Sequence, residues 1–187
     1  AHIGSDGLFQ QRPETSKHAC NLNLGDVRRR AYMNLLLCAV FRDAARIADE
    51  LELPDEAAIA RRREASLRNA LDRHLWDEAG GFYREAVETP RFGAEANALA
   101  LSLGLVSPER ARRIAPQFKK IGHGKFQSLA SRGRFEYGFA QSGLQMLFDH
   151  NWFKLLDDDW KGAWTTTECM GMMTKGWGDE SHRSEER

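Results

Sequence analysis

The residues with the greatest potential for chemistry lie in one segment, WTTTECMGMMTKGWGDESH, residues 164–182. Glu168 follows three consecutive threonines, and Trp164 and Trp177 stand on either side of it. A carboxylate can act as a general base when it is ionised and within hydrogen-bond reach of the proton it accepts. Nearby hydroxyls can orient it, and tryptophan faces can hold an apolar ligand face. The spacing Thr165-x-x-Glu168 also fits a capping box that starts a helix, so both hypotheses stay open on the residues alone.

Two further residues of this segment, Asp179 and His182, carry hydrogen-bonding groups. His182 can equally be a solvated residue, because the sequence ends five residues later. The other histidines share no metal-ligand spacing with the cysteines, and the adjacent carboxylates at 157–159 would point in different directions on a helix. A phosphate-binding glycine loop is also lacking. The sequence therefore predicts neither a metal site nor a cofactor.

The composition limits the class of protein. The chain has 187 residues, enough for one compact domain with a core. Lysine plus arginine and aspartate plus glutamate both number 27. The net charge is therefore zero, which argues against a nucleic-acid binder that relies on an overall positive field. The hydrophobic fraction of 42% fits a globular chain, and no apolar run reaches membrane-spanning length. We predict no nucleic-acid partner and no membrane partner.

The three cysteines, Cys20, Cys38 and Cys169, form neither a disulfide framework nor a CxxC pair, so a reducing compartment is the default. Cys38 lies in an apolar run and is predicted to be a core residue. Cys169 is either a small buried residue beside a site or a nucleophile. No signal peptide is visible, which favours the cytoplasm, but the loop-like first residues suggest a start within a longer protein that leaves the compartment undetermined.

Helical periodicity dominates from Val27 onward and must supply the frame for residues 164–182. A first helix is predicted over 27–51, apolar on nearly every side in its first half and so buried on most faces. A second helix opens at Pro54, with an apolar face on one side and the RRRE run on the other. The apolar positions that define the two helices are Leu36, Val40, Ala44, Ile47 and Leu51 in the first, and Ile59, Leu67, Ala70, Leu71 and Leu75 in the second.

The middle of the chain contains clear signals for a turn, a helix start and a helix break. Gly80-Gly81 predicts a turn beside a short extended piece. A third helix, AEANALALSLGL over 94–105, is again apolar on most faces. Ser107-Pro108 predicts the start of a fourth helix, with serine as N-cap and proline in the first turn. Pro116 should break or kink that helix because it has no N–H to donate.

The last part of the helical region is predicted as a loop over 122–134, a fifth helix over 135–149 and a sixth over 151–162. Helices that are apolar all round thus alternate with one-sided helices, which is the pattern that concentric rings of antiparallel helices require. The prediction is an all-α fold of helical hairpins in a toroid-type arrangement, with an irregular segment at 1–26, the helical domain at 27–182 and a polar tail at 183–187.

Three stretches together carry a family resemblance: LWDEAGGFYRE, then ANALALSLGLVSPERARRIA, then the tryptophan, threonine run, glutamate and Asp-x-Ser-His of residues 164–182. They resemble the catalytic domain of bacterial α-L-rhamnosidases, which are six-hairpin glycosidases with an (α/α)6 barrel. The resemblance covers roughly residues 27–182. It implies the C-terminal half of such a barrel, so we expect a partial toroid of about six helices.

The resemblance implies roles for the residues of the segment. Glu168 is expected to be the general base of an inverting glycoside hydrolase, and His182 a substrate contact. By their own chemistry, Trp164 and Trp177 could form walls of such a sugar site, and Asp179 could accept hydrogen bonds from sugar hydroxyls. The expected partner is a carbohydrate substrate, a terminal α-L-rhamnoside. The general acid belongs to the other half of the barrel.

Two other functions stay open. One is a different six-hairpin carbohydrate enzyme, either another glycosidase or a sugar epimerase that would need histidine bases inside the barrel. The other is a non-catalytic helical scaffold. Half a barrel should leave inner helices such as 94–105 exposed, so self-association or association with a further barrel half is also expected.

Overall fold

The computed structural model describes residues 3–10, 29–118 and 124–149, with the backbone alone for residues 124–126 and 149. Helical residues make up 66% and strand residues 8% of the described residues, which form six α-helices. This confirms the predicted all-α class, whereas the toroid stays a prediction. Residues 1–97 and 98–187 form two units, each compact in itself.

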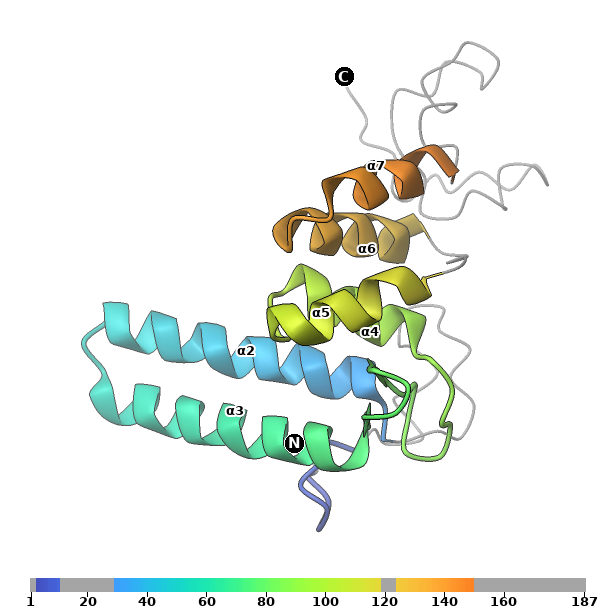
Figure 1. Ribbon diagram of the computed structural model, residues 1–187. Helices are drawn as coiled ribbons and strands as arrows, with labels where there is room; N and C mark the ends of the chain where they lie inside the picture. Colours follow the sequence, from blue (N-terminus) through green and yellow to red (C-terminus); the bar gives the residue numbers. More distant parts are fainter. Residues whose placement is uncertain (1–2, 11–28, 119–123, 150–187) are drawn as a thin grey trace, which may run out of the picture. The chain divides into compact units, whose positions relative to one another are not determined.

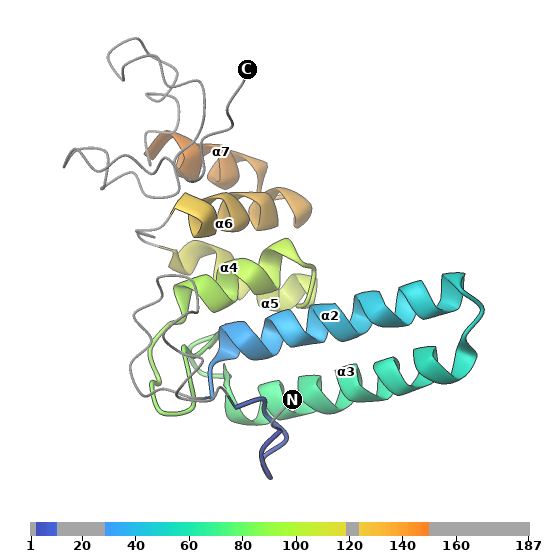
Figure 2. The ribbon, with the colours of Figure 1, turned by 180° about the vertical axis from the view of Figure 1, so that it is seen from behind.

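The first unit is built on a pair of long antiparallel helices, α2 (Ala31–Glu50) and α3 (Pro54–His74), which lie side by side in both views (Figures 1 and 2). Helix α3 begins at Pro54, as predicted, with acidic residues in its first turn and basic residues in its last, which suits the helix dipole. The connecting residue Glu52 adopts the left-handed conformation, with φ of 56°. The N–H groups of Glu52 and Leu53 donate to the carbonyls of Asp49 and Ala48, which closes the end of α2 as a Schellman motif.

The large apolar residues of α2 are where the sequence prediction is wrong. Leu36, Val40, Ile47 and Leu51 are 37%, 51%, 61% and 63% exposed, and Ala44 is exposed too. We call these five residues the α2 stripe. The buried face of α2 consists mainly of small residues, among them Cys38, which is fully buried as predicted. Alanines contribute little to an apolar pattern but allow a close approach of α3, so periodicity alone selects the wrong face.

The packing partner α3 is one-sided, as predicted. Leu67, Leu71 and Leu75 are at most 3% exposed, and residues 61–63 of the RRRE run are exposed. Ile59 is the exception, at 41% exposed. Alanines on either side of Ile59 take the buried positions instead, which continues the small-residue contact with α2.

A short hairpin follows α3, as the Gly80-Gly81 pair predicts. Strands β1 (Trp76–Asp77) and β2 (Phe82–Tyr83) are antiparallel, with Trp76 opposite Tyr83 and Asp77 opposite Phe82. The turn needs glycine because Gly81 has φ of +73°. Trp76 and Tyr83 pack edge to face, with ring centroids 5.1 Å apart.

Helix α4 (Ala94–Ser102) is apolar on all sides, as predicted, but it is not left exposed. All of residues 96–102 are buried, so the expectation of an exposed helix over 94–105 is wrong. The helix ends in a Schellman motif at Gly104, with φ of +62°. There the N–H groups of Gly104 and Leu105 donate to the carbonyls of Leu101 and Ala100.

Helix α5 (Pro108–Ile114) begins as predicted, with Ser107 as N-cap. The Ser107 hydroxyl oxygen accepts a hydrogen bond of 3.2 Å from the backbone N–H of Arg110. The helix stops at Ile114 and continues as the 3-10 turn η1 (Ala115–Gln117), which contains Pro116. The predicted break at this proline is therefore confirmed.

The end of the described chain differs from the prediction. Residues 122–134, predicted as a loop, lie largely within helix α6 (Gly124–Glu136), and the helix predicted from Phe135 starts later, as α7 (Ala140–Asp149). The two helices lie side by side in Figures 1 and 2. The buried positions of α6 are occupied by small or polar residues, so no apolar stripe marks it. They are Gln127, Ala130, Ser131, Gly133 and Arg134.

The remaining predicted elements fall outside the described residues. These are the helix over 151–162 and the boundaries of the helical domain near 26 and 182. Within the described ranges, none of the helices is long and apolar enough to cross a membrane.

Candidate functional site

The five residues of the predicted site, Glu168, Trp164, Trp177, Asp179 and His182, all lie outside the described residues. The structure therefore neither brings them together nor separates them. What it does describe are the polar clusters on the helical frame, and these show which groups are committed to the fold.

One cluster holds the hairpin of β1 and β2. The Asp77 carboxylate accepts a hydrogen bond of 2.9 Å from the Gly80 N–H and lies 3.5 Å from Arg84. The bond from Gly80 and the charge of Arg84 lower the pKa of Asp77. The indole N–H of Trp76 donates to Glu78 at 2.6 Å. These carboxylates are committed to the turn, so we assign them no catalytic role.

A second cluster joins residues far apart in the sequence of the first unit. Arg29 bridges Asp6 and Glu88, at 3.1 and 2.6 Å, while the largely buried Arg30 lies 3.8 Å from Glu85. Burial alone would raise the pKa of Asp6, but the Leu8 N–H and Arg29 outweigh it, so the pKa is lowered. The geometry is that of charged groups tying the two residues just before α2 to the loops around them.

Two buried asparagines form the same side-chain clamp. The Asn97 amide group donates to the carbonyls of Tyr83 and Gly93, at 2.7 and 2.8 Å, and its oxygen accepts the Tyr83 N–H at 2.9 Å. Asn34 repeats this arrangement. Its amide group donates to the carbonyls of Phe9 and Arg30, at 3.2 and 2.8 Å, and its oxygen accepts the Phe9 N–H at 2.7 Å.

The two clamps match in position as well as in chemistry. Each asparagine is the fourth residue of its helix, counted from Ala31 in α2 and from Ala94 in α4. Each grips an extended residue that lies two positions after a glycine with positive φ, Gly7 or Gly81. Sequence reasoning missed both residues. The signal that was available is an asparagine at the same helical position before an apolar run.

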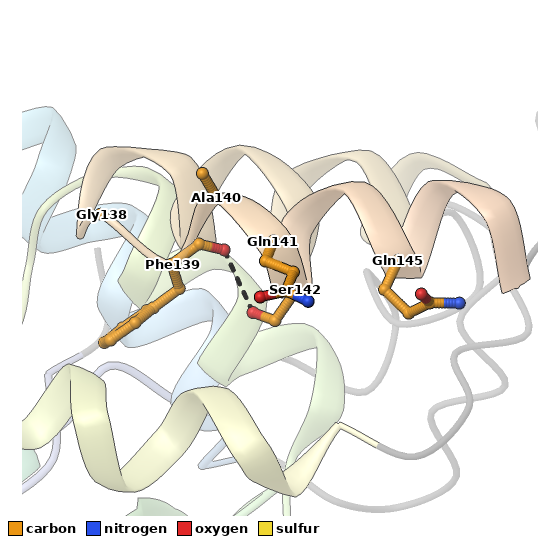
Figure 3. A pocket seen from close by; sticks show the side chains of 6 residues that line it. All are labelled: Gly138, Phe139, Ala140, Gln141, Ser142 and Gln145. Carbon is orange, nitrogen blue, oxygen red and sulfur yellow. Dashed lines mark hydrogen bonds between the residues drawn. The ribbon is translucent and has the colours of Figure 1, made fainter.

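In the second unit, a surface hollow of about 480 Å³ lies at the start of α7 (Figure 3). Its lining is uncharged and more apolar than polar, with Phe139 and Ala140 beside the side chains of Gln141, Ser142 and Gln145. The Ser142 hydroxyl donates to the Phe139 carbonyl at 3.2 Å, and the side chains of Gln141 and Gln145 are exposed. None of the described residues that line the hollow is titratable, so these side chains cannot transfer a proton.

The most unusual group of the second unit is Arg134 on α6, which is 5% exposed. Its guanidinium donates to the carbonyl of Ala115 and the sulfur of Met146, both at 2.8 Å, and stacks over Phe118 at 5.2 Å. No carboxylate of the described residues pairs with it, and desolvation lowers its pKa. A cation in this position organises the packing of α6, because its neutral partners come from η1 and α7.

Among the described residues, no group of three or more histidine, cysteine, aspartate or glutamate side chains is placed to hold a metal ion. Cys38 is fully buried and its pKa is raised to about 12 by desolvation, so this thiol is not an activated nucleophile. Cys169 lies outside the described residues.

No protein-family model and no curated protein matches the chain. The functional assignment therefore depends on the residues of the segment 164–182 and on the helical architecture that precedes it.

Proposed function

We propose that the chain is a glycoside hydrolase domain, or part of one, that cleaves terminal α-L-rhamnosides with inversion and uses Glu168 as the general base. The observation that carries the proposal is the arrangement of one carboxylate after a threonine run, between Trp164 and Trp177, with an Asp-x-Ser-His sequence behind it. The all-α frame of paired helices supports the proposal, because catalytic groups are commonly carried by loops on a rigid scaffold.

The proposed mechanism assigns each residue of the segment a task. Glu168 takes a proton from a water molecule as the water attacks the anomeric carbon, on the face opposite the leaving oxygen. A general acid protonates that oxygen. Trp164 and Trp177 bury the apolar faces of the sugar ring, while Asp179 and His182 hydrogen-bond to its hydroxyls. No metal or cofactor takes part in these steps.

The test is hydrolysis of a dinitrophenyl α-L-rhamnoside by the chain and by its Glu168→Gln variant. This leaving group is a weak base and needs little acid assistance, so the assay reports on the base. We expect turnover to fall by about two to four orders of magnitude in Glu168→Gln. The matched control is Glu109→Gln, which removes the same charge at an exposed position in the first turn of α5 and should leave turnover unchanged.

A second readout is the anomer of the first product, followed by NMR before mutarotation. An inverting reaction releases β-L-rhamnose, whereas retention would contradict the assignment of Glu168 as a base acting on water. Equal turnover in the Glu168→Gln and Glu109→Gln variants would refute Glu168 as the base. Absence of turnover by the unaltered chain would mean that this chain is an incomplete site or a scaffold.

The α2 stripe favours one alternative, a helical scaffold without catalytic activity. Four large apolar side chains that stay 37–63% exposed along one helix are a common mark of an association surface. A chain that associates through α2 but fails to turn over the rhamnoside would support this alternative, and a chain that does both would be an enzyme with an additional interface.

A further inference from the structure

The α2 stripe lies on the side of α2 that faces away from its packed side. At 3.6 residues per turn, the five stripe residues span an arc of about 80°. The mean direction of the buried residues Leu35, Cys38 and Ala45 is roughly 160–180° away from the centre of that arc. Helix α2 is therefore apolar on two opposite faces, and the described chain covers one of them. The inference drawn from this face does not depend on the proposed catalytic activity.

The spacing of the stripe is symmetric along the helix. Leu36 and Leu51 are equally far from the point between residues 43 and 44, and so are Val40 and Ile47. When two α2 helices cross antiparallel about an axis at this point, Leu36 of one copy meets Leu51 of the other, and Val40 meets Ile47. Ala44 lies at the axis, where a small side chain permits close approach. The steps of three and four residues are those of a helix–helix seam.

The charges near the axis are balanced. Asp43 and Arg46 are both solvent-exposed, with side chains 54% and 75% accessible, and within one chain they lie 3.9 Å apart. An antiparallel pair about this point brings the two Asp43 carboxylates to the same side of the axis, about one residue apart along it, with Arg46 of each copy about two residues from Asp43 of the other. Two charges of each sign therefore gather around the axis, and the two arginines offset the two carboxylates. A two-fold interface requires such self-complementarity, because the same patch must serve both partners.

From these observations we propose that the chain forms a two-fold symmetric dimer through the α2 stripe, with the two α2 helices antiparallel. A single pair of helices in contact over about four turns buries an area at the low end of specific interfaces. We therefore expect a dimer that dissociates in the roughly micromolar range.

The first test is sedimentation equilibrium of the full chain over a range of concentrations. The unaltered chain should show a reversible monomer–dimer equilibrium. Val40→Glu and, independently, Arg46→Glu should weaken it at least about tenfold, because they place carboxylates at the apolar seam or around the axis. The matched control Phe148→Glu changes an apolar side chain of similar exposure, 58%, on α7 and should have no effect. Circular dichroism establishes that each variant keeps its helix content.

The second test fixes the orientation by disulfide trapping, in a background with Cys20→Ser and Cys169→Ser. Cys38 is fully buried and should not compete. Ala44→Cys should cross-link with itself at the axis. Leu36→Cys should cross-link with Leu51→Cys when the two chains are mixed, but should not cross-link with itself.

Three results would overturn the proposal. One is a chain that stays monomeric at several hundred micromolar, which would mean that the α2 stripe is covered within one chain or by another protein. Another is a dimer that Phe148→Glu disrupts and Val40→Glu does not. The third is efficient self-cross-linking of Leu36→Cys, which would indicate a parallel pair.

Discussion

Replacing Asn97 by alanine should be among the most damaging single changes in the first unit. Asn97 is fully buried and makes three side-chain hydrogen bonds to the backbone, all 2.7–2.9 Å long. The truncation removes the Asn97 acceptor of the Tyr83 N–H in a buried setting, which costs about 1–3 kcal/mol. The carbonyls of Tyr83 and Gly93 each keep a backbone bond, from Gly93 and Asn97, so their losses are smaller, about 0.5–1 kcal/mol each.

The sum is a decrease of about 2–5 kcal/mol in the free energy of unfolding, a large part of what a domain of this size has. The corresponding change at Asn34 should cost less, about 1–3 kcal/mol, because its partner Phe9 is only half-buried and water can replace the lost bonds. Asn69, exposed on α3, is the matched control. Alanine there should be neutral or slightly stabilising, since it is the better helix former.

The assay is urea unfolding of the three variants, followed by far-ultraviolet circular dichroism. The expected order of destabilisation is Asn97→Ala, then Asn34→Ala, then Asn69→Ala. An Asn97→Ala variant within about 1 kcal/mol of Asn69→Ala would refute the clamp as a stabilising element. An effect larger at Asn34 than at Asn97 would refute the argument from burial.

Three other predictions concern the backbone, the packing of α6 and the buried thiol. Glu52→Gly should raise the free energy of unfolding by about 0.5–1 kcal/mol in a urea titration, because glycine tolerates the φ of 56°, whereas Glu50→Gly inside α2 should lower it. Gly133→Ala should lower the melting temperature, since a Cβ would come within 2.9 Å of the backbone of α4; Gly143→Ala, whose Cβ would meet only a phenyl ring at 3.1 Å, should change it little. Cys38, with its pKa raised from 9.0 to about 12 by burial, should resist thiol reagents at pH 8 until the chain unfolds. Because the unfolded thiol ionises first, unfolding experiments should show stability that is intact below pH 9 and falls as the pH rises from 9 toward 12, by at most about 1.4 kcal/mol per unit.

Local backbone signals were the part of the fold that the sequence predicted well. Pro54, the Ser107-Pro108 pair, Pro116 and the Gly80-Gly81 pair each mark an element boundary where the structure has one. These signals act through the dihedral angles and the missing or added hydrogen bonds of the residues themselves. They therefore need no knowledge of what packs against them.

Predictions that depend on a packing partner were less successful. Helix α6 escaped prediction because its inward positions carry the polar residues Gln127, Ser131 and Arg134, and the partners of Arg134 come from other elements. The face of α2 was misjudged because burial there follows the small residues that admit α3, and not the largest apolar side chains. In both cases hydrophobic periodicity reports the composition of a face, whereas burial is decided by the shape of the neighbour.

The candidate site could be predicted only as a set of residues. Glu168 and the four residues around it lie beyond the described part of the chain, so their geometry stays a prediction. The clamp residues Asn34 and Asn97 were missed for a different reason. Their partners Phe9 and Tyr83 lie 25 and 14 residues away, a distance at which no local pattern connects an amide to the backbone that it holds.

The matching clamps give α2 and α4 the same beginning, yet the two helices differ in burial. Both helices begin with an asparagine in the fourth position that holds an extended residue behind a positive-φ glycine. Helix α4 is buried from Ala96 to Ser102. Helix α2 is apolar on most sides only in its first half, and one of its apolar faces, the α2 stripe, is exposed. In the proposed dimer a second α2 covers the α2 stripe, so that α2, like α4, is buried on most of its apolar surface.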